Sequence, residues 1–421
     1  MAAGIIGGQT ACRISSYYVV YPPTPCSSFH SNIIKRIPTT CNGRYRASLI
    51  MNPESFEVGR LIGSYGFMSV TNYSSGLQSI DSLQEQREEE AVGGLRFQDV
   101  RQGNVQIRLY EGRVTQGPRR GTPIIFKVYP GKQVGGLEAD MMASNELGSH
   151  AFLQSCSKVI CQNIQILLGG FETKTGEQWL AFRNDGKYCA ADYAKASCEK
   201  VSKNLALGAQ KVWNPFEEEQ YIKRKRYFVI KLLHGALCGL AYMHENERLH
   251  QSLGPASVVL NTMVDKDSAY LVPRLRDLAF SVDIRFPSLE ENSGGLSDGL
   301  WRRARSAGAF TLMEKRAFGI ADDIYGAGLL FAYMAFIPFC EAGIVDSLSL
   351  QRLLESTFKL DLAATREYCL ADDRFLEAVK FLDLGDGAGW ELLQAMLNPD
   401  FRNRPIAEAV VNHRFLTGAL L

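Results

Sequence analysis

The chain has 421 residues, of which 46% are hydrophobic and 22% are charged, and its formal net charge at pH 7 is +1. This length is sufficient for one large or two ordinary domains, and the composition is that of a globular protein with a sizeable core. The near-neutral charge balance excludes the strongly basic composition of nucleic-acid-binding proteins, so we expect no nucleic-acid partner.

Residues 1–50 differ from the remainder in composition. They contain no Asp or Glu, are rich in Ser and Thr, and carry five basic residues, Arg13, Lys35, Arg36, Arg44 and Arg46. This composition is typical of an organelle transit peptide, and the start "MAAG" favours a plastid. We therefore expect residues 1–50 to be a chloroplast transit peptide, with a disordered tail as the alternative. The mature protein is expected in the stroma or peripherally on the thylakoid.

Ten cysteines are present, three of them in residues 1–50. The other seven are scattered, with no C-x-x-C pair and no Cys/His cluster. The sequence therefore predicts reduced thiols, without structural zinc or a disulfide framework.

Residues 51–94 are predicted to be a region preceding the main domain, ending in the acidic linker "SLQEQREEEAVGG". Gly59, Gly63 and Gly66 in this region resemble a glycine-rich phosphate loop, but glycine spacing alone is a weak signal. The stretch also lies some sixty residues before the strand lysine described below. We therefore expect an ordinary loop here.

From residue 95 the pattern changes to that of a folded domain. The segments "NVQIRLYEGRV", "TPIIFKVYP", "NIQILLGGF" and "WLAFR" have strand character, and "GLEADMMASNELGSHAFL" between the second and third has helical character. Residues 95–186 are thus predicted to be a small strand-rich lobe. Residues 187–421 are predicted to be mainly helical, with a hairpin around "VDKDS".

The most apolar stretch of the chain is "IYGAGLLFAYMAFIPFC", residues 324–340. It is shorter than most membrane-spanning helices and contains Pro338. We expect a buried central helix and no transmembrane segment.

Three motifs carry residue types used in phosphoryl transfer. "IIFK" ends at Lys127 and matches the strand lysine of V-A-I-K, and "HQSLGPAS", which begins at His250, matches the catalytic loop H-R-D-L-K-P-x-N. "RDLAFS" matches the region of D-F-G, with Asp277 as its aspartate.

Two further motifs follow in the order found in protein kinases. "DDIYGAG" resembles the D-x-W-S-x-G start of the central helix, with Asp323 as the match, and "NPDFRNRPIAEAVVNHRFL" resembles the closing helices, with Arg404 as the match. Five matches in order make chance a poor explanation. The chain thus resembles the protein kinases, which implies an α+β, bilobal protein-kinase-like fold with a small strand-rich N-lobe and a larger helical C-lobe.

Within that superfamily, one subfamily is more similar. "EQWLAFRNDG", "DDIYGAG" and "LDLGDGAGWELLQAMLNPDFRNRP" resemble the chloroplast state-transition thylakoid kinases and the kinase-like part of a plastid-lipid-associated protein. This resemblance implies a plastid setting and other plastid proteins as partners. The oligomeric state is not predicted.

The catalytic loop departs from the kinase pattern at each chemical position. Ser252, Gly254 and Ser257 stand where kinases have the proton-accepting Asp, the phosphate-facing Lys and the metal-binding Asn. A serine hydroxyl is not a carboxylate base near neutral pH. His250 remains, at a position that packs, so we expect the loop to keep its architecture without an intact catalytic set.

The nucleotide-binding groups are partly present. We place Gln102, Asn104 and Ile107 at the three glycine positions of the phosphate loop, where a side chain opposes close approach of the backbone to phosphate. Lys127 and Asp277 remain as candidate contacts for ATP and Mg²⁺. Structural retention is the equal alternative for Lys127, whereas for Asp277 a structural or residual metal-binding role is favoured over catalysis. The helix partner of Lys127 is predicted to be Glu138, with Glu146 as the second candidate.

Three residues are assigned structural roles by the same resemblance. Asp323 is expected to anchor the backbone of the catalytic loop. Glu314 is expected to be the activation-segment glutamate that pairs with Arg404.

We therefore predict a catalytically impaired kinase-like protein that acts as a scaffold or an allosteric regulator. One alternative is an active Ser/Thr kinase with a rearranged site, which would use another carboxylate: Asp192, Asp265, Asp267 or Asp283. The other is a kinase-fold nucleotidyltransferase. Both alternatives require ATP and Mg²⁺ at Lys127 and Asp277.

Overall fold

A computed structural model describes five segments of the chain, residues 49–67, 105–157, 161–207, 215–285 and 296–417. The predicted transit peptide lies outside the described residues, except for Leu49 and Ile50, and so do Gln102 and Asn104.

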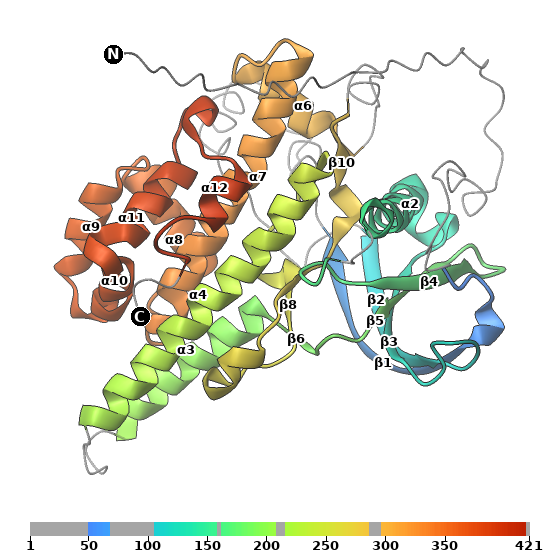
Figure 1. Ribbon diagram of the computed structural model, residues 1–421, viewed down its shortest axis with the longest axis horizontal. Coiled ribbons are helices and arrows are strands. Elements are labelled where there is room, and N and C mark those ends of the chain that lie inside the picture. Colours follow the sequence, from blue (N-terminus) through green and yellow to red (C-terminus); the bar gives the residue numbers. More distant parts are fainter. Residues whose placement is uncertain (1–48, 68–104, 158–160, 208–214, 286–295, 418–421) are drawn as a thin grey trace, which may run out of the picture. The chain divides into compact units, whose positions relative to one another are not determined.

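The N-terminal part is built on a five-stranded antiparallel sheet in the order β1-β2-β3-β5-β4. The strands are β1 (Phe56–Phe67), β2 (Val105–Val114), β3 (Pro123–Tyr129), β4 (Leu167–Glu172) and β5 (Gln178–Arg183). One long helix, α2 (Lys132–Cys156), packs on one face of this sheet (Figure 1).

The sequence of β3 shows how the sheet sorts its side chains. Successive residues of a strand point to opposite faces, so Ile124, Phe126 and Val128 share one face and pack with other aromatic and aliphatic residues there. Lys127 and Tyr129 point to the other face, which α2 covers. A charged side chain is thereby placed beneath a helix.

The loop predicted at Gly59, Gly63 and Gly66 is wrong, because this stretch is strand β1. Gly63 pairs with Leu109 and Gly66 with Gln106, and the register shifts between Val58 and Gly63. Glycines accompany bulges of this kind and interrupt the hydrophobic alternation that marks a strand. The sheet therefore begins at Phe56, before the predicted boundary at residue 95.

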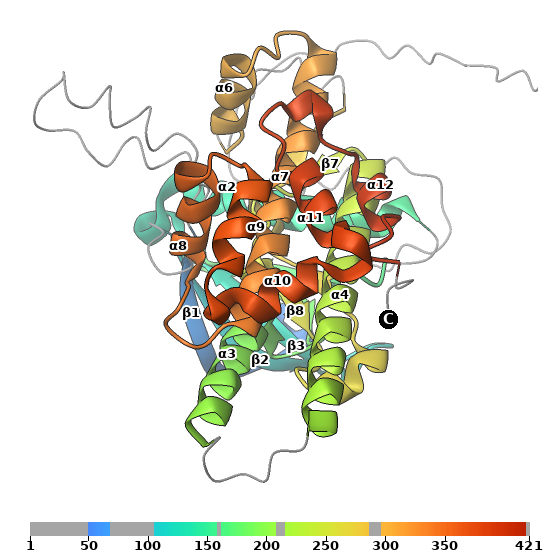
Figure 2. The ribbon, with the colours of Figure 1, turned by 90° about the vertical axis from the view of Figure 1, so that its left-hand side faces the viewer.

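The C-terminal part is mainly helical, as predicted. Its α-helices are α3 (Ala190–Leu207), α4 (Pro215–Glu245), α6 (Asp298–Ser306), α7 (Leu312–Phe336), α8 (Ser347–Arg352), α9 (Leu362–Leu370), α10 (Leu376–Leu382), α11 (Leu384–Met396) and α12 (Ala407–Val411). Figure 2 shows α8 to α11 gathered beside α7.

The predicted central helix is α7, which continues as a 3₁₀ turn to Phe339. Among the described residues, Leu312–Phe339 is the one helical stretch with the length and composition to cross a membrane, and 78% of its most apolar window is buried inside the protein. The apolar residues of α7 form part of the main hydrophobic core. This burial agrees with the prediction of a core helix.

Two small ladders hold the segments that carry the motifs. β7 (Arg248–Leu249) pairs with β10 (Val282–Asp283), and β8 (Val258–Leu260) pairs with both β6 (Tyr188–Cys189) and β9 (Arg274–Leu275). Residues 250–257 run between β7 and β8, and residues 276–281 run between β9 and β10. The predicted hairpin is β8–β9, and its connection contains a 3₁₀ helix, Asp265–Tyr270.

Candidate functional site

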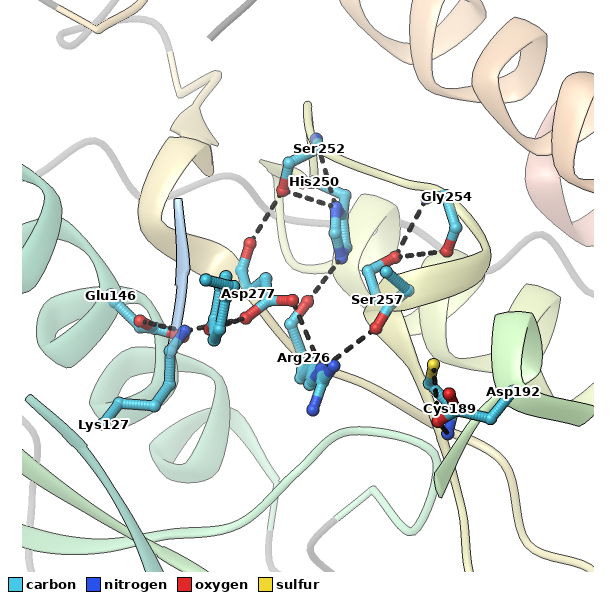
Figure 3. Close-up of polar contacts among 12 residues, drawn as sticks. Lys127, Glu146, Cys189, Asp192, His250, Ser252, Gly254, Ser257, Arg276 and Asp277 are labelled. Carbon is cyan, nitrogen blue, oxygen red and sulfur yellow. Dashed lines mark hydrogen bonds and ion pairs between the residues drawn. The ribbon is translucent and has the colours of Figure 1, made fainter. Parts of the chain in front are cut away.

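The site centres on Lys127, whose ammonium group joins three elements. Its Nζ lies 2.7 Å from both carboxylate oxygens of Glu146 on α2 and 2.8 Å from Oδ1 of Asp277, just before a 3₁₀ turn (Figure 3). The side chains of all three residues are at most 4% exposed. The Tyr129 hydroxyl also donates to Glu146.

The charges of this cluster stabilise one another. Burial alone lowers the pKa of Lys127, but Asp277 and Glu146 outweigh it and hold that pKa well above its ordinary value. Burial raises the pKa of Asp277, whereas Lys127 and Arg276 outweigh it and lower that pKa to about 2. The lysine is therefore cationic and the aspartate anionic at neutral pH.

Glu146, the second candidate, is the glutamate paired with Lys127, and the first candidate, Glu138, is wrong. Met142, Ala143, Glu146, Leu147 and His150 recur at three- and four-residue spacing, which places them on the buried face of α2. Glu138 lies two turns earlier, near the kink at Gly136, where φ is +66°. The lysine's hydrogen bonds go to Glu146 and Asp277.

His250 and Ser252 are buried, and both bond to the segment that carries Asp277. The Ser252 hydroxyl donates to the backbone carbonyl of Asp277 at 2.7 Å, and the Ser252 amide donates to His250 Nδ1 at 3.2 Å. His250 Nε2 lies 3.1 Å from the carbonyl of Arg276, which assigns its proton to Nε2. Burial lowers the pKa of His250, so the ring is neutral.

Ser257 closes the other end of the same loop. Its hydroxyl donates to the Gly254 carbonyl at 2.8 Å and accepts from the Gly254 amide at 3.0 Å. Pro255 begins the short 3₁₀ turn that these bonds enclose. The residues at the phosphate-facing and metal-binding positions of the motif are thus bonded to one another.

Asp323, at the middle of α7, holds the start of this loop. Its carboxylate accepts from the amides of His250 and Gln251 at 2.7 and 2.9 Å, and from His244 Nε2 at 2.9 Å. The residue is 2% exposed. These bonds are the ones expected of a residue that anchors the backbone of the catalytic loop, which is the role predicted for Asp323.

Arg276 is a cation next to Asp277 that the motif comparison did not single out. Its Nε lies 3.3 Å from Asp277 Oδ2 and donates to the Ala256 carbonyl at 3.0 Å. Asp277 itself is in the left-handed region, with φ at +66°, a conformation that Asp tolerates better than most residues. Arg276 and Lys127 therefore approach opposite oxygens of one carboxylate.

Tyr65, near the end of β1, is the second residue that sequence reasoning missed. Its hydroxyl donates to Asp277 Oδ1 at 2.9 Å, and its ring centroid is 5.9 Å from Lys127 Nζ. Burial raises the pKa of Tyr65, and the neighbouring Asp277 adds to this, so the hydroxyl keeps its proton.

The glycine-loop prediction changes accordingly. Ile107 lies inside β2, fully buried and directly opposite Tyr65, so its assignment to the third glycine position is wrong. The stretch "GSYGFMSV", residues 63–70, can instead be aligned with the kinase pattern G-x-G-x-x-G-x-V at Gly63 and Val70, which puts Tyr65 and Met68 at the second and third glycine positions. Residues 68–104 separate β1 from β2 and obscured this match.

In the structure, the groups at the kinase positions for a magnesium nucleotide are bonded to one another. Mg²⁺ is usually held by one or two carboxylates and by substrate phosphates, with near-octahedral oxygen ligands. Asp277 bonds to Lys127 and Tyr65 through Oδ1 and pairs with Arg276 through Oδ2, and Ser257 is bonded to Gly254. Over the described part of the chain, no three His, Cys, Asp or Glu side chains gather as a metal site.

The predicted pair of Glu314 and Arg404 is wrong. Glu314 belongs to the capping box that begins α7, accepting from the Thr311 amide at 2.9 Å. The Arg404 guanidinium instead donates to the carbonyls of Asn398 and Ala321, and it lies 4.6 Å from the ring centroid of Tyr325. Both residues hold local structure, each with its own partners.

The comparisons with known proteins agree with this architecture. A crystal structure of a Stt7 homolog from Micromonas algae, soaked with ATP, matches 91% of this chain and 99% of its own, with a TM-score of 0.54 and 16% identity. Calcium-dependent protein kinase 6 of Plasmodium berghei (strain Anka) is 23% identical over 232 residues, which is 54% of this chain and 13% of that kinase. No family model matches the sequence.

Together, the sheet, the helical part and these similarities define the fold. The chain has the fold of the protein-kinase-like superfamily, as the order of its motifs predicted.

Proposed function

We propose that this chain is a plastid protein-kinase-like protein with an impaired catalytic centre, and that it acts by binding other plastid proteins as a scaffold or an allosteric regulator. One observation carries the proposal. At the position of the catalytic aspartate, Ser252 donates its hydroxyl to the Asp277 carbonyl, so this side chain supports the loop and presents no base.

The size of the catalytic loss follows from the role of the missing group. General acid–base catalysis by a positioned side chain contributes about 10²–10⁴-fold in rate. Gly254 supplies no cation at the phosphate-facing position, and Ser257 supplies no amide at the metal position. We therefore expect phosphotransfer to fall below the range of working kinases.

The carboxylates named for a rearranged kinase site have other partners or lie on the surface, which favours the proposal over this alternative. Asp265 accepts from the Tyr193 hydroxyl at 2.6 Å, Asp192 accepts from the Cys189 amide at 2.8 Å, and Asp283 pairs with Arg285. Asp267 is exposed at the 3₁₀ helix after β8. A nucleotidyltransferase would need Asp277 as a metal ligand, and both oxygens of that carboxylate are engaged.

A phosphotransfer assay tests the catalytic part of the proposal. Full-length protein is incubated with radiolabelled ATP and Mg²⁺ or Mn²⁺, alone and with general acceptor proteins, beside an active kinase of similar size. We expect incorporation at the level of a heat-denatured sample. Incorporation that is lost on replacing Ser252 with Ala would refute the proposal.

Two further experiments test the setting and the mode of action. The plastid assignment rests on the composition of residues 1–50 and on the resemblance to plastid kinases. Residues 1–50 fused to a fluorescent protein are expected to enter chloroplasts, and a cytosolic signal contradicts the assignment. Association with plastid proteins, measured by quantitative co-purification, is expected to be equal for wild type and Ser252→Ala.

A further inference from the structure

The side chain of Tyr65 lies at the point where a kinase-like site would receive phosphate groups. In the kinase pattern the strand lysine pairs with phosphates, and the D-F-G aspartate holds the metal that bridges them. The Tyr65 hydroxyl bonds to that aspartate at 2.9 Å, and the aspartate oxygen that it contacts also bonds to Lys127 at 2.8 Å. A phosphate bridging the two residues would have to displace the Tyr65 side chain, both its hydroxyl and its ring.

The backbone of Tyr65 is held in place by the sheet. Tyr65 pairs with Ile107, and its neighbours Ser64 and Gly66 pair with Arg108 and Gln106. The tyrosine stands at the second glycine position of the pattern in residues 63–70. Glycine serves there because the backbone must approach phosphate without a side chain between them.

The charges beneath Tyr65 are already balanced. Lys127 and Arg276 are the cations, and Glu146 and Asp277 are the anions. Each oxygen of Asp277 contacts a cation, a role that a magnesium ion would otherwise fill. A triphosphate and its metal ion would therefore have to share Lys127 and Asp277 with these ion pairs, as well as take the place of the Tyr65 side chain.

We propose that Tyr65 closes the phosphate subsite of this fold and is the residue that excludes nucleoside triphosphates from it. The inference rests on the proposed function, in that it treats the Lys127–Asp277 cluster as a site derived from a nucleotide pocket. It adds that the site is closed by one removable side chain. Replacing Tyr65 with glycine restores the residue type of the pattern and leaves Lys127 and Asp277 intact.

The test is a fluorescence titration of the full-length protein with mant-ATP, with Mg²⁺ and with EDTA. We expect no saturation of the wild type up to about 1 mM, a range that covers ordinary nucleotide affinities. Tyr65→Gly is expected to bind at least tenfold more tightly, and Tyr65→Phe is expected to remain closed because the ring is retained. Leu61→Gly, an exposed position on the same strand, is the matched control for loosening β1.

The location of binding is checked with the double variant that combines Tyr65→Gly with Lys127→Met. This variant should lose the affinity for mant-ATP that Tyr65→Gly gained, and circular dichroism should show that it is folded. Equal affinity of the wild type and Tyr65→Gly overturns the inference, and so does a folded Tyr65→Gly that binds no nucleotide. These outcomes are distinct from failure of the proposed function, which requires phosphotransfer by the wild type. Tyr65→Gly should bind without transferring phosphate, because Ser252 is unchanged.

Discussion

Replacing Lys127 with Met is the most direct test of the buried cluster. The substitution removes the shared partner of two carboxylates whose side chains are at most 4% exposed. Removing one partner of a buried ion pair costs about 3–5 kcal/mol, because the remaining charge loses its compensation. Glu146 keeps the Tyr129 hydroxyl, and Asp277 keeps Arg276 and Tyr65. We therefore expect a loss of about 3–5 kcal/mol in the free energy of unfolding.

The assay is urea denaturation at pH 7 followed by circular dichroism and tryptophan fluorescence. Lys174→Met, in the exposed turn between β4 and β5, is the matched control and should change stability by less than about 0.5 kcal/mol. Lys127→Met combined with Glu146→Gln should be more stable than the sum of the single variants predicts, by about 0.5–3 kcal/mol. A loss below about 1 kcal/mol in Lys127→Met would refute the electrostatic account of the cluster.

Three further predictions follow from other contacts. Ser252→Asp alone should leave phosphotransfer at background in the radiolabel assay, because Gly254 and Ser257 are unchanged, and robust transfer would contradict the account of the loop. Arg404→Ala should cost about 2–3 kcal/mol in unfolding free energy, Glu314→Ala should lower stability through the lost capping box of α7, and a double-mutant cycle should give a coupling below about 0.5 kcal/mol. Because the pKa of Asp277 falls to about 2 in the folded protein, below about 3.9 when unfolded, its contribution of about 2–3 kcal/mol is complete above pH 5 and is lost as the pH falls towards 2. Acid titration of Asp277→Asn should therefore show a shallower loss of stability, and an unchanged slope would oppose this assignment.

The fold was predictable because the motif residues are local in sequence. The strand preceding Lys127 alternates clearly, and the catalytic-loop and Asp277 segments keep their order between short ladders. The position of Asp323 was predictable because the motif "DDIYGAG" places it within the apolar central helix. These features depend on short-range sequence patterns.

The sequence did not predict the contacts that depend on long-range geometry. Choosing between Glu138 and Glu146 requires the rotation of α2 after its kink at Gly136, which spacing alone does not define. Tyr65 lies 212 residues from Asp277 along the chain, and residues 68–104 interrupt the strand pair that brings it there. The signal that could have found Tyr65 was the complete eight-residue pattern, including its two substituted glycine positions.

The bonds from Asp323 show which groups determine the conformation of the catalytic loop. The carboxylate that fixes the backbone of residues 250 and 251 comes from α7 and is itself held by His244 of α4, and neither helix supplies the side chain at position 252. These supports of the loop therefore do not depend on which side chain stands at position 252. The conformation of the loop therefore does not by itself require an acidic group at position 252.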